Sequence, residues 1–574
     1  YYLGYYSFRI PTYDSEDYHI IQTIPLIMSR SHTARLEKLV DQGIALGSSS
    51  SAHGGRDPRT IMFLLYGKSE ETLRQCEEFL FNEIERLKNE PVSDLELQIA
   101  KNKLDADFVF SVQDASSIAE QIGYFHTVYE LDYLKTIRDK YRNITKDDIQ
   151  RVARKYLDTD YVIRGYLFPD TSGKAPAPQP VAQIDENSHG KFYDQDKGSR
   201  IDIRKFMPKE LEYKINLKDK IVRKVLPNGA VVLAMQNPNF DIVSIKGTLR
   251  SGPVFDTVGK TGLATLTVSC LQYGSSKFDK EQIDLKKDLI SLRGKIDTGL
   301  ETVTFNYSMV SDKFDQALEL IADFIQNPTF PENYFEQEKA NLSIYFQQKE
   351  QSPEDLQDEA FCEMLYGGNH PYSNSKYGKF ADFQKLTVND VKEFHKKNYG
   401  PEHLIIAAVG PQSPEELISI VEKHFGSWKR SGNPNEMAFD DMEPLTGVKD
   451  KHISLPGRSQ TYIRMGWPGI KIKDGDYYPL LMLNTILGGG SLSSRLGTEI
   501  RVKSGMAYSV YSYIRPRTFK GSINVVLNTK AGNEEEVKKK ILAVIKDVID
   551  KGVTDEEFFI CLLYTSPSPR DRTR

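Results

Sequence analysis

The segment Leu487–Tyr508 reads Leu-Gly-Gly-Gly-Ser-Leu-Ser-Ser-Arg-Leu-Gly-Thr-Glu-Ile-Arg-Val-Lys-Ser-Gly-Met-Ala-Tyr. Its consecutive glycines, Gly488–Gly490, predict a turn that leads into an amphipathic helix, and Gly505 predicts the end of that helix. Arg501 and Tyr508 flank this helix end, where both side chains can donate hydrogen bonds to a carbonyl or an oxyanion. On this segment alone, a surface arginine and a core tyrosine at an ordinary helix-to-strand junction is the simpler interpretation.

The triple glycine does not indicate a nucleotide site. No Gly-Lys-Ser or Gly-Lys-Thr follows it, so it lacks the signature of a phosphate-binding loop. No dinucleotide-binding pattern surrounds it either. The interpretation of Arg501 and Tyr508 therefore depends on the rest of the chain.

The composition is that of a globular protein with several domains. At 574 residues the chain is too long for one hydrophobic core, so three or four domains are expected. A net charge of −5 and a pI of about 6.2 argue against a nucleic-acid-binding surface. No apolar run approaches the roughly 18 to 20 residues that span a bilayer. The four cysteines lie far apart without a C-x-x-C pair, and indicate neither a zinc ribbon nor a disulfide framework.

Hydrophobic periodicity predicts an α+β chain in three blocks. The first block, residues 1–169, contains a helix from Asp17 to about Gln42, and long helices over Glu70–Asn89 and Asp94–Ser111. A stretch rich in proline and charge, residues 170–219, predicts a linker.

The second block covers residues 220–432 and opens with a hairpin whose turn is Asn228-Gly229. The third covers residues 437–560. Residues 561–574 lose all periodicity and resemble translated adapter sequence, so we expect a non-native tail there. Because Tyr1 falls inside an expected strand, we also expect the N-terminus to be a truncation.

The first and third blocks share an internal repeat. Pro11, Asp17-Tyr18 and Arg35-Leu36 recur as Pro468, Asp476-Tyr477 and Arg495-Leu496, with a spacing that differs by one residue between Asp and Arg. A duplicated domain is therefore more consistent with the sequence than a mosaic of unrelated domains.

Six motifs distributed over both halves of the chain resemble the insulinase/pitrilysin family of zinc metallopeptidases, the inverzincins. They are Leu-Pro-Asn-Gly at 226–229, Arg-Ser-Gly at 250–252, Gly-Leu-Ala at 262–264, the segment Tyr366–Tyr372, Tyr-Gly-Pro at 399–401 before a strand ending at Val409-Gly410, and Leu487–Tyr508. The resemblance implies four homologous α+β domains, each a mixed sheet with helices on one face, in two halves that close like a clamshell around an unfolded peptide.

In these terms, residues 1–169 resemble the second family domain, 220–432 the third and 437–560 a truncated fourth, and the first domain is expected to be missing. Family members carry H-x-x-E-H in that first domain, where two histidines and a distal glutamate bind zinc and the intervening glutamate is the general base. The motif occurs nowhere in this chain, so no metal ligand is predicted in it.

The third domain shows what replaces the motif. Its two histidine positions are Thr265 and Ser269, its glutamate position is Val268, and its distal ligand position is Tyr345. None of these side chains can supply zinc chemistry, so this domain is expected to be non-catalytic.

The resemblance gives Arg501 and Tyr508 a role in catalysis. They fall on the family's arginine and tyrosine, which reach across the closed chamber to the peptide and to the developing oxyanion at the zinc. The corresponding place in the first block, Val40-Asp-Gln-Gly-Ile-Ala-Leu46, has neither residue. This asymmetry favours substrate and oxyanion binding by Arg501 and Tyr508 over the simpler interpretation.

The resemblance thus predicts a zinc-dependent endopeptidase that encloses and hydrolyses unfolded peptides, with zinc as cofactor and no zinc ligand in this chain. An unfolded peptide is the expected partner, without nucleic acid or a membrane span. Similarity to long bacterial members suggests a periplasmic location. The alternative is a family member without catalytic activity, which binds peptides or assembles with other subunits. Oligomeric state and peptide specificity stay undetermined.

Overall fold

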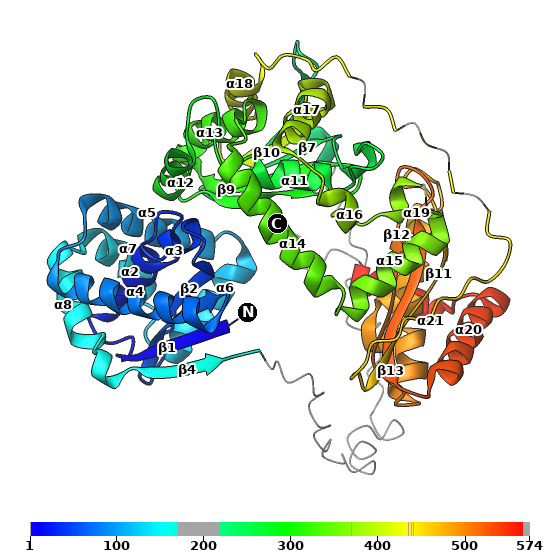
Figure 1. Ribbon diagram of the computed structural model, residues 1–574, viewed down its shortest axis with the longest axis horizontal. Helices are drawn as coiled ribbons and strands as arrows, with labels where there is room; N and C mark the ends of the chain where they lie inside the picture. The colour runs from blue at the N-terminus through cyan, green and yellow to red at the C-terminus, as the bar shows by residue number, and fades with distance from the viewer. Residues whose placement is uncertain are drawn as a thin grey trace.

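The computed structural model describes residues 2–169 and 217–565, apart from the single positions 369, 434, 438, 440 and 443. Most of the predicted linker at 170–219 therefore lies outside the described residues. The described chain forms three α+β units, each built on its own sheet (Figure 1). The prediction of an α+β chain with repeated domains is confirmed.

The first unit is a four-stranded antiparallel sheet covered by helices. Its strands pair in the order β2-β3-β1-β4. The elements are β1 (Tyr2–Ile10), α1 (Tyr18–Ile21), α2 (Thr23–Met28), α3 (Glu37–Asp41), β2 (Ala45–Ala52), β3 (Arg59–Gly67), α4 (Glu70–Asn89), α5 (Asp94–Ser111), α6 (Ala115–Val128), α7 (Tyr133–Asn143), α8 (Lys146–Tyr156), the 3-10 turn η1 (Thr159–Tyr161) and β4 (Ile163–Leu167). Alternate residues of β3 are buried, as expected for a sheet with one covered face.

The second unit has a mixed six-stranded sheet, because β10 runs parallel to β6 and antiparallel to β7. The strand order is β5-β6-β10-β7-β9-β8. The elements are α10 (Leu217–Lys220), β5 (Val222–Val225), β6 (Val231–Gln236), β7 (Ile242–Leu249), η3 (Pro253–Phe255), α11 (Leu263–Cys270), α12 (Lys280–Leu289), β8 (Arg293–Thr298), β9 (Val303–Val310), η4 (Ser311–Lys313), α13 (Phe314–Gln326), α14 (Glu332–Lys349), α15 (Pro353–Tyr366), η5 (Pro371–Ser373), α16 (Phe380–Phe383), α17 (Val388–Asn398), η6 (Pro401–His403), β10 (Leu404–Gly410) and α18 (Pro414–Phe425).

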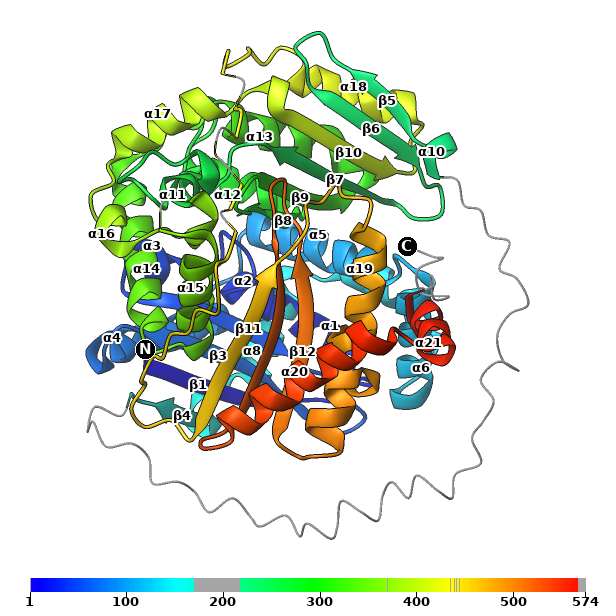
Figure 2. The ribbon, with the colours of Figure 1, turned by 90° about the vertical axis from the view of Figure 1, so that its right-hand side faces the viewer.

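The third unit repeats the first. Its antiparallel order β11-β13-β12 matches β1-β3-β2, and Figure 2 shows α19, α20 and α21 beside this sheet. The elements are β11 (Gln460–Pro468), α19 (Tyr477–Asn484), the π-helix η7 (Thr485–Gly489), η8 (Ser491–Ser493), the π-helix η9 (Gly497–Val502), β12 (Ala507–Arg515), β13 (Ser522–Lys530), α20 (Glu534–Lys551) and α21 (Asp555–Thr565). No described helix is both long enough and apolar enough to cross a membrane.

Three local predictions are corrected by the structure. The helix expected from Asp17 to Gln42 is three short helices, because the polar run from Ser29 to Thr33 leaves the helix to contact the second unit. Of the glycines after Leu487, only Gly490 lies in a turn, since Gly488 and Gly489 extend α19 as a π-helix. The boundary expected at residue 561 falls inside α21, which continues to Thr565.

In the first unit, a buried arginine holds two helices together. Arg35 Nε lies 2.8 Å from Glu96 Oε1, and Arg35 Nη1 lies 3.2 Å from Glu83 Oε2. Glu96 is also the third residue of α5 and forms a capping box with Ser93. The arginine thereby joins α4 and α5 to the segment before α3.

The third unit contains the same arrangement of one arginine bound by carboxylates from two successive helices, which we call the arginine clamp. Arg495 Nε lies 2.6 Å from Glu557 Oε1, and Arg495 Nη1 lies 3.0 Å from Asp547 Oδ2. Glu557 exchanges hydrogen bonds with Thr554 as Glu96 does with its cap. Glu83 lies fourteen residues after Ser69, the N-cap of α4, and Asp547 lies fourteen residues after Asn533, the N-cap of α20. The repeat predicted from sequence is therefore confirmed at the level of individual side chains.

The first and second units meet at a buried carboxylate, Asp288 at the end of α12. Its oxygens accept hydrogen bonds from the backbone N–H groups of His32 at 3.0 Å and Thr33 at 2.8 Å. Lys103 Nζ lies 2.9 Å away, and Asp288 is 0% exposed. Burial would raise the pKa of Asp288, but Lys103 holds it below its ordinary value. This polar joint fixes the first unit against the second.

The third unit packs on the second through α15. Phe361 lies against Gly466 of β11, where a Cβ would come within 2.6 Å of the Phe361 ring. Asp358 of the same helix accepts hydrogen bonds from Arg515, at 2.7 Å, and from Arg464. A hydrophobic cluster with Tyr372 surrounds this contact. The second unit is therefore in contact with both the first and the third.

The two clamps differ in burial, which predicts different costs for their removal. In Arg35→Leu, Glu83 keeps only the half-exposed Arg86 as a partner, in a site where its own side chain is 6% exposed, and the first unit is expected to lose about 3 kcal/mol. Arg495→Leu is the matched control with a smaller loss, because the Asp547 side chain is 43% exposed. Hydrogen exchange of β1 and β11 measures the two units separately. Equal loss of protection in both variants would contradict this prediction.

Candidate functional site

Arg501 and Tyr508 lie at a helix-to-strand junction whose path is fixed by buried neighbours. Arg501 stands near the end of η9, and Gly505 ends the helical segment in the left-handed region with φ +60°. Leu496 and Ile500 anchor η9 in the core at 0% exposure. The predicted helix end at Gly505 is therefore present, and it delivers the chain into β12.

Tyr508 is placed by a β-bulge. Ala507 pairs with Thr529 and Ser509 with Asn528, so Tyr508 is an extra residue without a partner position on β13. A bulge re-aims a side chain away from the regular alternation of the strand. The Tyr508 side chain is accordingly exposed, at 78%. The sequence did not predict the bulge, because it arises from pairing with residues twenty positions later.

The two side chains are close together. The Arg501 guanidinium carbon lies 5.0 Å from the centre of the Tyr508 ring, within the range of a cation–π contact. Among the residues that the structure describes, no carboxylate forms an ion pair with Arg501. The pair thus presents a guanidinium and a phenol to solvent, both with donor capacity for an incoming oxygen atom.

Gly488 supports this site by allowing close packing. A Cβ at Gly488 would lie 2.5 Å from Ser512 Oγ and 2.6 Å from the Ser512 backbone nitrogen. The glycine therefore lets η7 approach β12 directly, four residues after Tyr508 on the strand. Its role is in packing, not in binding a ligand.

The first unit has the same backbone geometry without the functional side chains. Gly43 follows α3 with φ +70°, and Ala45 pairs with Gly67 while Gly47 pairs with Tyr66. Leu46 therefore occupies the bulge position that Tyr508 takes in the third unit. The two copies share the left-handed glycine and the bulge, but they differ in side chains and in the helix before the glycine, which is the α-helix α3 in the first unit and the π-helix η9 in the third.

The positions of the zinc motif in the second unit are filled by packing interactions. Thr265 Oγ1 donates to the backbone carbonyl of Lys376, and Val268 is 7% exposed in the core. The Tyr345 ring lies 4.1 Å from the ring of Tyr377, and burial raises its pKa. Among the described residues, no group of three or more His, Cys, Asp or Glu side chains could hold a metal ion. These residues do not fit zinc.

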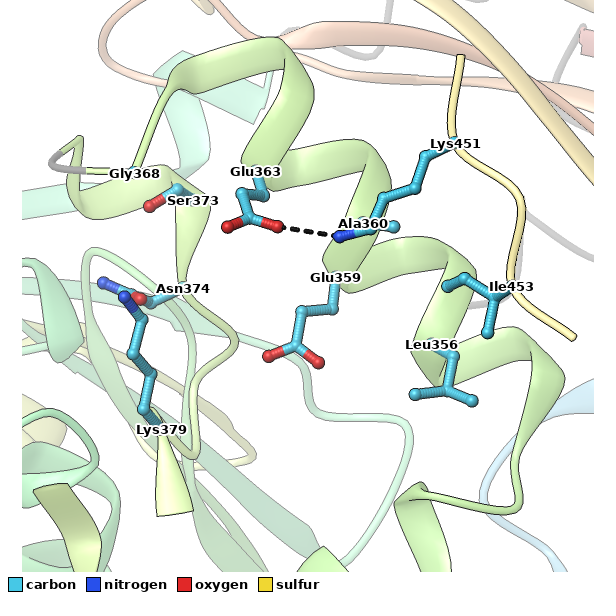
Figure 3. Close-up of a pocket in the computed structure, with 10 residues that line it drawn as sticks. All are labelled: Leu356, Glu359, Ala360, Glu363, Gly368, Ser373, Asn374, Lys379, Lys451 and Ile453. Carbon is cyan, nitrogen blue, oxygen red and sulfur yellow. Dashed lines mark hydrogen bonds and ion pairs between the residues drawn. The ribbon is translucent and has the colours of Figure 1, made fainter. Parts of the chain in front are cut away.

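A hollow of about 160 Å³ lies between α15 and the segment that leads into the third unit (Figure 3). Its two carboxylates are paired: Glu363 with Lys451 at 3.1 Å, and Glu359 with Lys349 at 2.7 Å, and Lys379 completes the charged lining. Lys449 also donates to the Met364 carbonyl at 2.9 Å. The hollow therefore belongs to the contact between the second and third units, and we do not assign it a substrate.

Family models match most of the described chain. The model described as the insulinase domain of peptidase family M16 matches residues 231–375, and the model of the M16 inactive domain matches residues 4–104 and 385–559. The chain belongs to the insulinase family of peptidases, M16. The peptidase-domain match thus lies within the second unit, whereas the inactive-domain match covers much of the first unit, the end of the second from residue 385, and the third.

Individual M16 proteins agree with this assignment. The uncharacterized zinc protease YmxG of Bacillus subtilis is 25% identical over 339 residues, which are 59% of this chain and 80% of that protein. The uncharacterized zinc protease ML0855 of Mycobacterium leprae is 25% identical over 341 residues, 59% of this chain and 75% of that protein.

Solved structures of the family share the fold. A peptidase M16 inactive domain from Pseudomonas fluorescens superposes with a TM-score of 0.56 at 26% identity, over 61% of this chain and 85% of that one. A protease from Helicobacter pylori gives the same TM-score at 20% identity, over 60% and 83% of the two chains, and shows the fold alone.

Because Thr265, Val268 and Tyr345 occupy positions of the zinc motif in the second unit, we predict that this M16 chain binds no stoichiometric zinc. After incubation with zinc and gel filtration, metal analysis of the 574-residue chain is expected to find only trace zinc, because a hydroxyl, a valine and a stacked tyrosine replace the donors. A chelator should leave the thermal transition unchanged. One equivalent of retained zinc, removed by chelation together with stability, would contradict the assignment.

Proposed function

We propose that this chain is the peptide-binding, zinc-free part of a zinc-dependent endopeptidase that hydrolyses unfolded peptides. Arg501 and Tyr508 bind the peptide carbonyl and its oxyanion, and a further peptidase-type domain supplies the zinc centre. The proposal rests chiefly on one observation, which is the way the first unit docks on the second.

The docking segment of the first unit is the counterpart of the segment that carries Arg501 and Tyr508. It runs from His32 to Leu46, on either side of the clamp arginine. Besides the hydrogen bonds to Asp288, Asp41 pairs with Lys280 at 2.8 Å, and Gln337 donates to the Val40 carbonyl at 3.5 Å. The same segment of the repeat thus contacts a unit of the peptidase type.

The docked segment contacts the helix that carries the distal ligand position of the second unit's zinc motif. Gln337 stands on α14, the helix that also carries Glu338 and the distal ligand position Tyr345. Glu338 in turn accepts a hydrogen bond from Tyr273, just after α11, at 2.6 Å. If the third unit docks on an intact peptidase domain in the same way, its segment approaches the corresponding metal site.

In the corresponding segment of the third unit, Arg501 and Tyr508 carry the hydrogen-bond donors that a place beside a zinc centre would require. A guanidinium and a phenol can both donate to the oxygen on which negative charge develops during peptide hydrolysis. Donors that act in the transition state contribute about 10²–10³ in kcat each. Leu46 in the first unit cannot make this contribution, which agrees with the lost zinc motif opposite it.

The second candidate function is peptide binding without hydrolysis. It is favoured by the matches to inactive domains and by the filled motif of the second unit. In that case Arg501 and Tyr508 hold a peptide backbone but face no metal. The two functions differ in whether a chelator stops cleavage.

Cleavage of a quenched fluorescent peptide by the complete gene product tests the proposal. Activity is expected to stop with a chelator and to return with zinc. Tyr508→Phe is expected to lower kcat about 100-fold with little change in KM or thermal stability, because the ring stays and only the donor is lost. Tyr511→Phe is the matched control, since Tyr511 lies on the same strand at 44% exposure, and it should keep full kcat.

Two outcomes would overturn this assignment. Metal-dependent cleavage at an unchanged rate in Tyr508→Phe would remove the proposed role of the phenol but keep the peptidase. Peptide binding without any metal-dependent cleavage would support the non-catalytic function.

A further inference from the structure

A cavity of about 440 Å³ lies at the joint between the first and second units. This size is within the range of small-molecule sites. Its polar lining consists of Arg30, Lys103, Asp107, Ser111, Ser291 and Arg293, and its apolar lining of Leu26, Phe110 and Leu292. Both units contribute to it, so any ligand bound there contacts both.

The side chains that line the cavity carry a net positive charge. Arg30 and Arg293 share a single carboxylate, Asp107, with Arg30 Nη2 3.7 Å from its oxygen. Lys103 pairs with the buried Asp288. Three cations are thus matched by two carboxylates, and one positive charge is left without a counterion among the described residues.

Arg293 is oriented by its surroundings. Its guanidinium carbon lies 4.0 Å from the centre of the Phe110 ring, a cation–π contact that restricts where the guanidinium can lie. Burial lowers its pKa, Asp107 opposes that effect, and Arg30 adds to it. A bound anion would relieve the repulsion between the two arginines.

Ser291 contributes a second, independent observation. It is 7% exposed, and its Oγ has no hydrogen-bond partner among the described residues. Its backbone is in the left-handed region with φ +50°, because it caps the C-terminus of α12, where the Ser291 N–H donates to the Asp288 carbonyl and the Leu292 N–H to the Lys287 carbonyl. A buried hydroxyl without a partner is unfavourable. The Ser291 Oγ is closed to solvent in this structure. Its missing partner is accounted for if the side chain turns toward the cavity and donates to a ligand there.

The helix that ends at this cavity does not oppose an anion strongly. The carbonyl of Leu289 at the end of α12 accepts a hydrogen bond from Asn102 Nδ2 at 2.8 Å, and the carbonyl of Lys287 accepts one from the Leu292 N–H at 2.9 Å. Because these carbonyls are occupied, the cations dominate the field in the cavity.

We propose that this cavity binds a small oxyanion, a phosphoryl or carboxylate group, between Arg30, Ser291 and Arg293. The guanidinium fork matches such groups in shape and charge. Since the ligand would join the two units, its binding stabilises their contact. This site is separate from Arg501 and Tyr508 and does not rest on the function proposed for them.

Calorimetric titration of the chain with inorganic phosphate, a nucleoside triphosphate and citrate tests the site. At least one is expected to bind saturably and to raise the thermal transition. Arg293→Gln should weaken that binding about tenfold or more. The matched control is Lys295→Gln, two residues along the same strand with its side chain 77% exposed, which should bind as the unaltered chain does. Phosphate and triphosphate binding without citrate binding would identify the phosphoryl class, and the reverse the carboxylate class.

Ser291→Gly separates a ligand role from a structural one. Glycine tolerates the positive φ and removes the unpartnered hydroxyl, so the variant should be more stable than the parent yet bind the anion more weakly. Affinity unchanged in both Ser291→Gly and Arg293→Gln would overturn the proposal, and so would the absence of saturable binding with all three anions.

Discussion

Each repeated unit depends on an arginine that is held by two carboxylates from successive helices. In the first unit, Arg35 ties the segment before α3 to α4 and α5, and its side chain is 9% exposed. Since Arg35 and Glu83 are desolvated together, removing Arg35 leaves the buried Glu83 with only the half-exposed Arg86 as a partner. The path of the chain on either side of the arginine is therefore closely defined. The loop of residues 29–33, which contacts the second unit, precedes Arg35, and the β-bulge at Leu46 follows it.

The same constraint explains how one backbone serves two purposes. In the first unit the segment beyond the clamp presents Asp41 and a leucine bulge to the second unit. In the third unit the equivalent segment presents Arg501 and Tyr508. A duplicated scaffold can thus change its chemistry by side-chain replacement, because the clamp and the bulge keep the positions fixed.

The second unit acts as a platform for the other two. The helix at its zinc-motif position, α11, is packed as a core element in which Thr265 donates to a carbonyl, and Tyr345 of α14 packs against Tyr377 with tilted rings. Its two contacts with the other units are different in character. The joint with the first unit is polar and centres on the buried Asp288, whereas the contact with the third combines Phe361 packed on a glycine with ion pairs. The stability of a polar joint of this kind depends more strongly on nearby charges than the stability of an apolar contact does.

The sequence by itself determined the elements with strong local signals: the helices Glu70–Asn89 and Asp94–Ser111, which match α4 and α5 residue for residue, the Asn228-Gly229 turn, the repeat, and the loss of zinc donors. These depend on periodicity, capping residues and residue identity, which are local. Strand β2 was missed, because Ala45–Ala52 is rich in serine and becomes a strand only by pairing with β3. The bulge that exposes Tyr508, the burial of Asp288 and the cavity beside Ser291 were decided by tertiary structure alone. Each arises where segments far apart in the chain meet, and no local pattern encodes such a meeting.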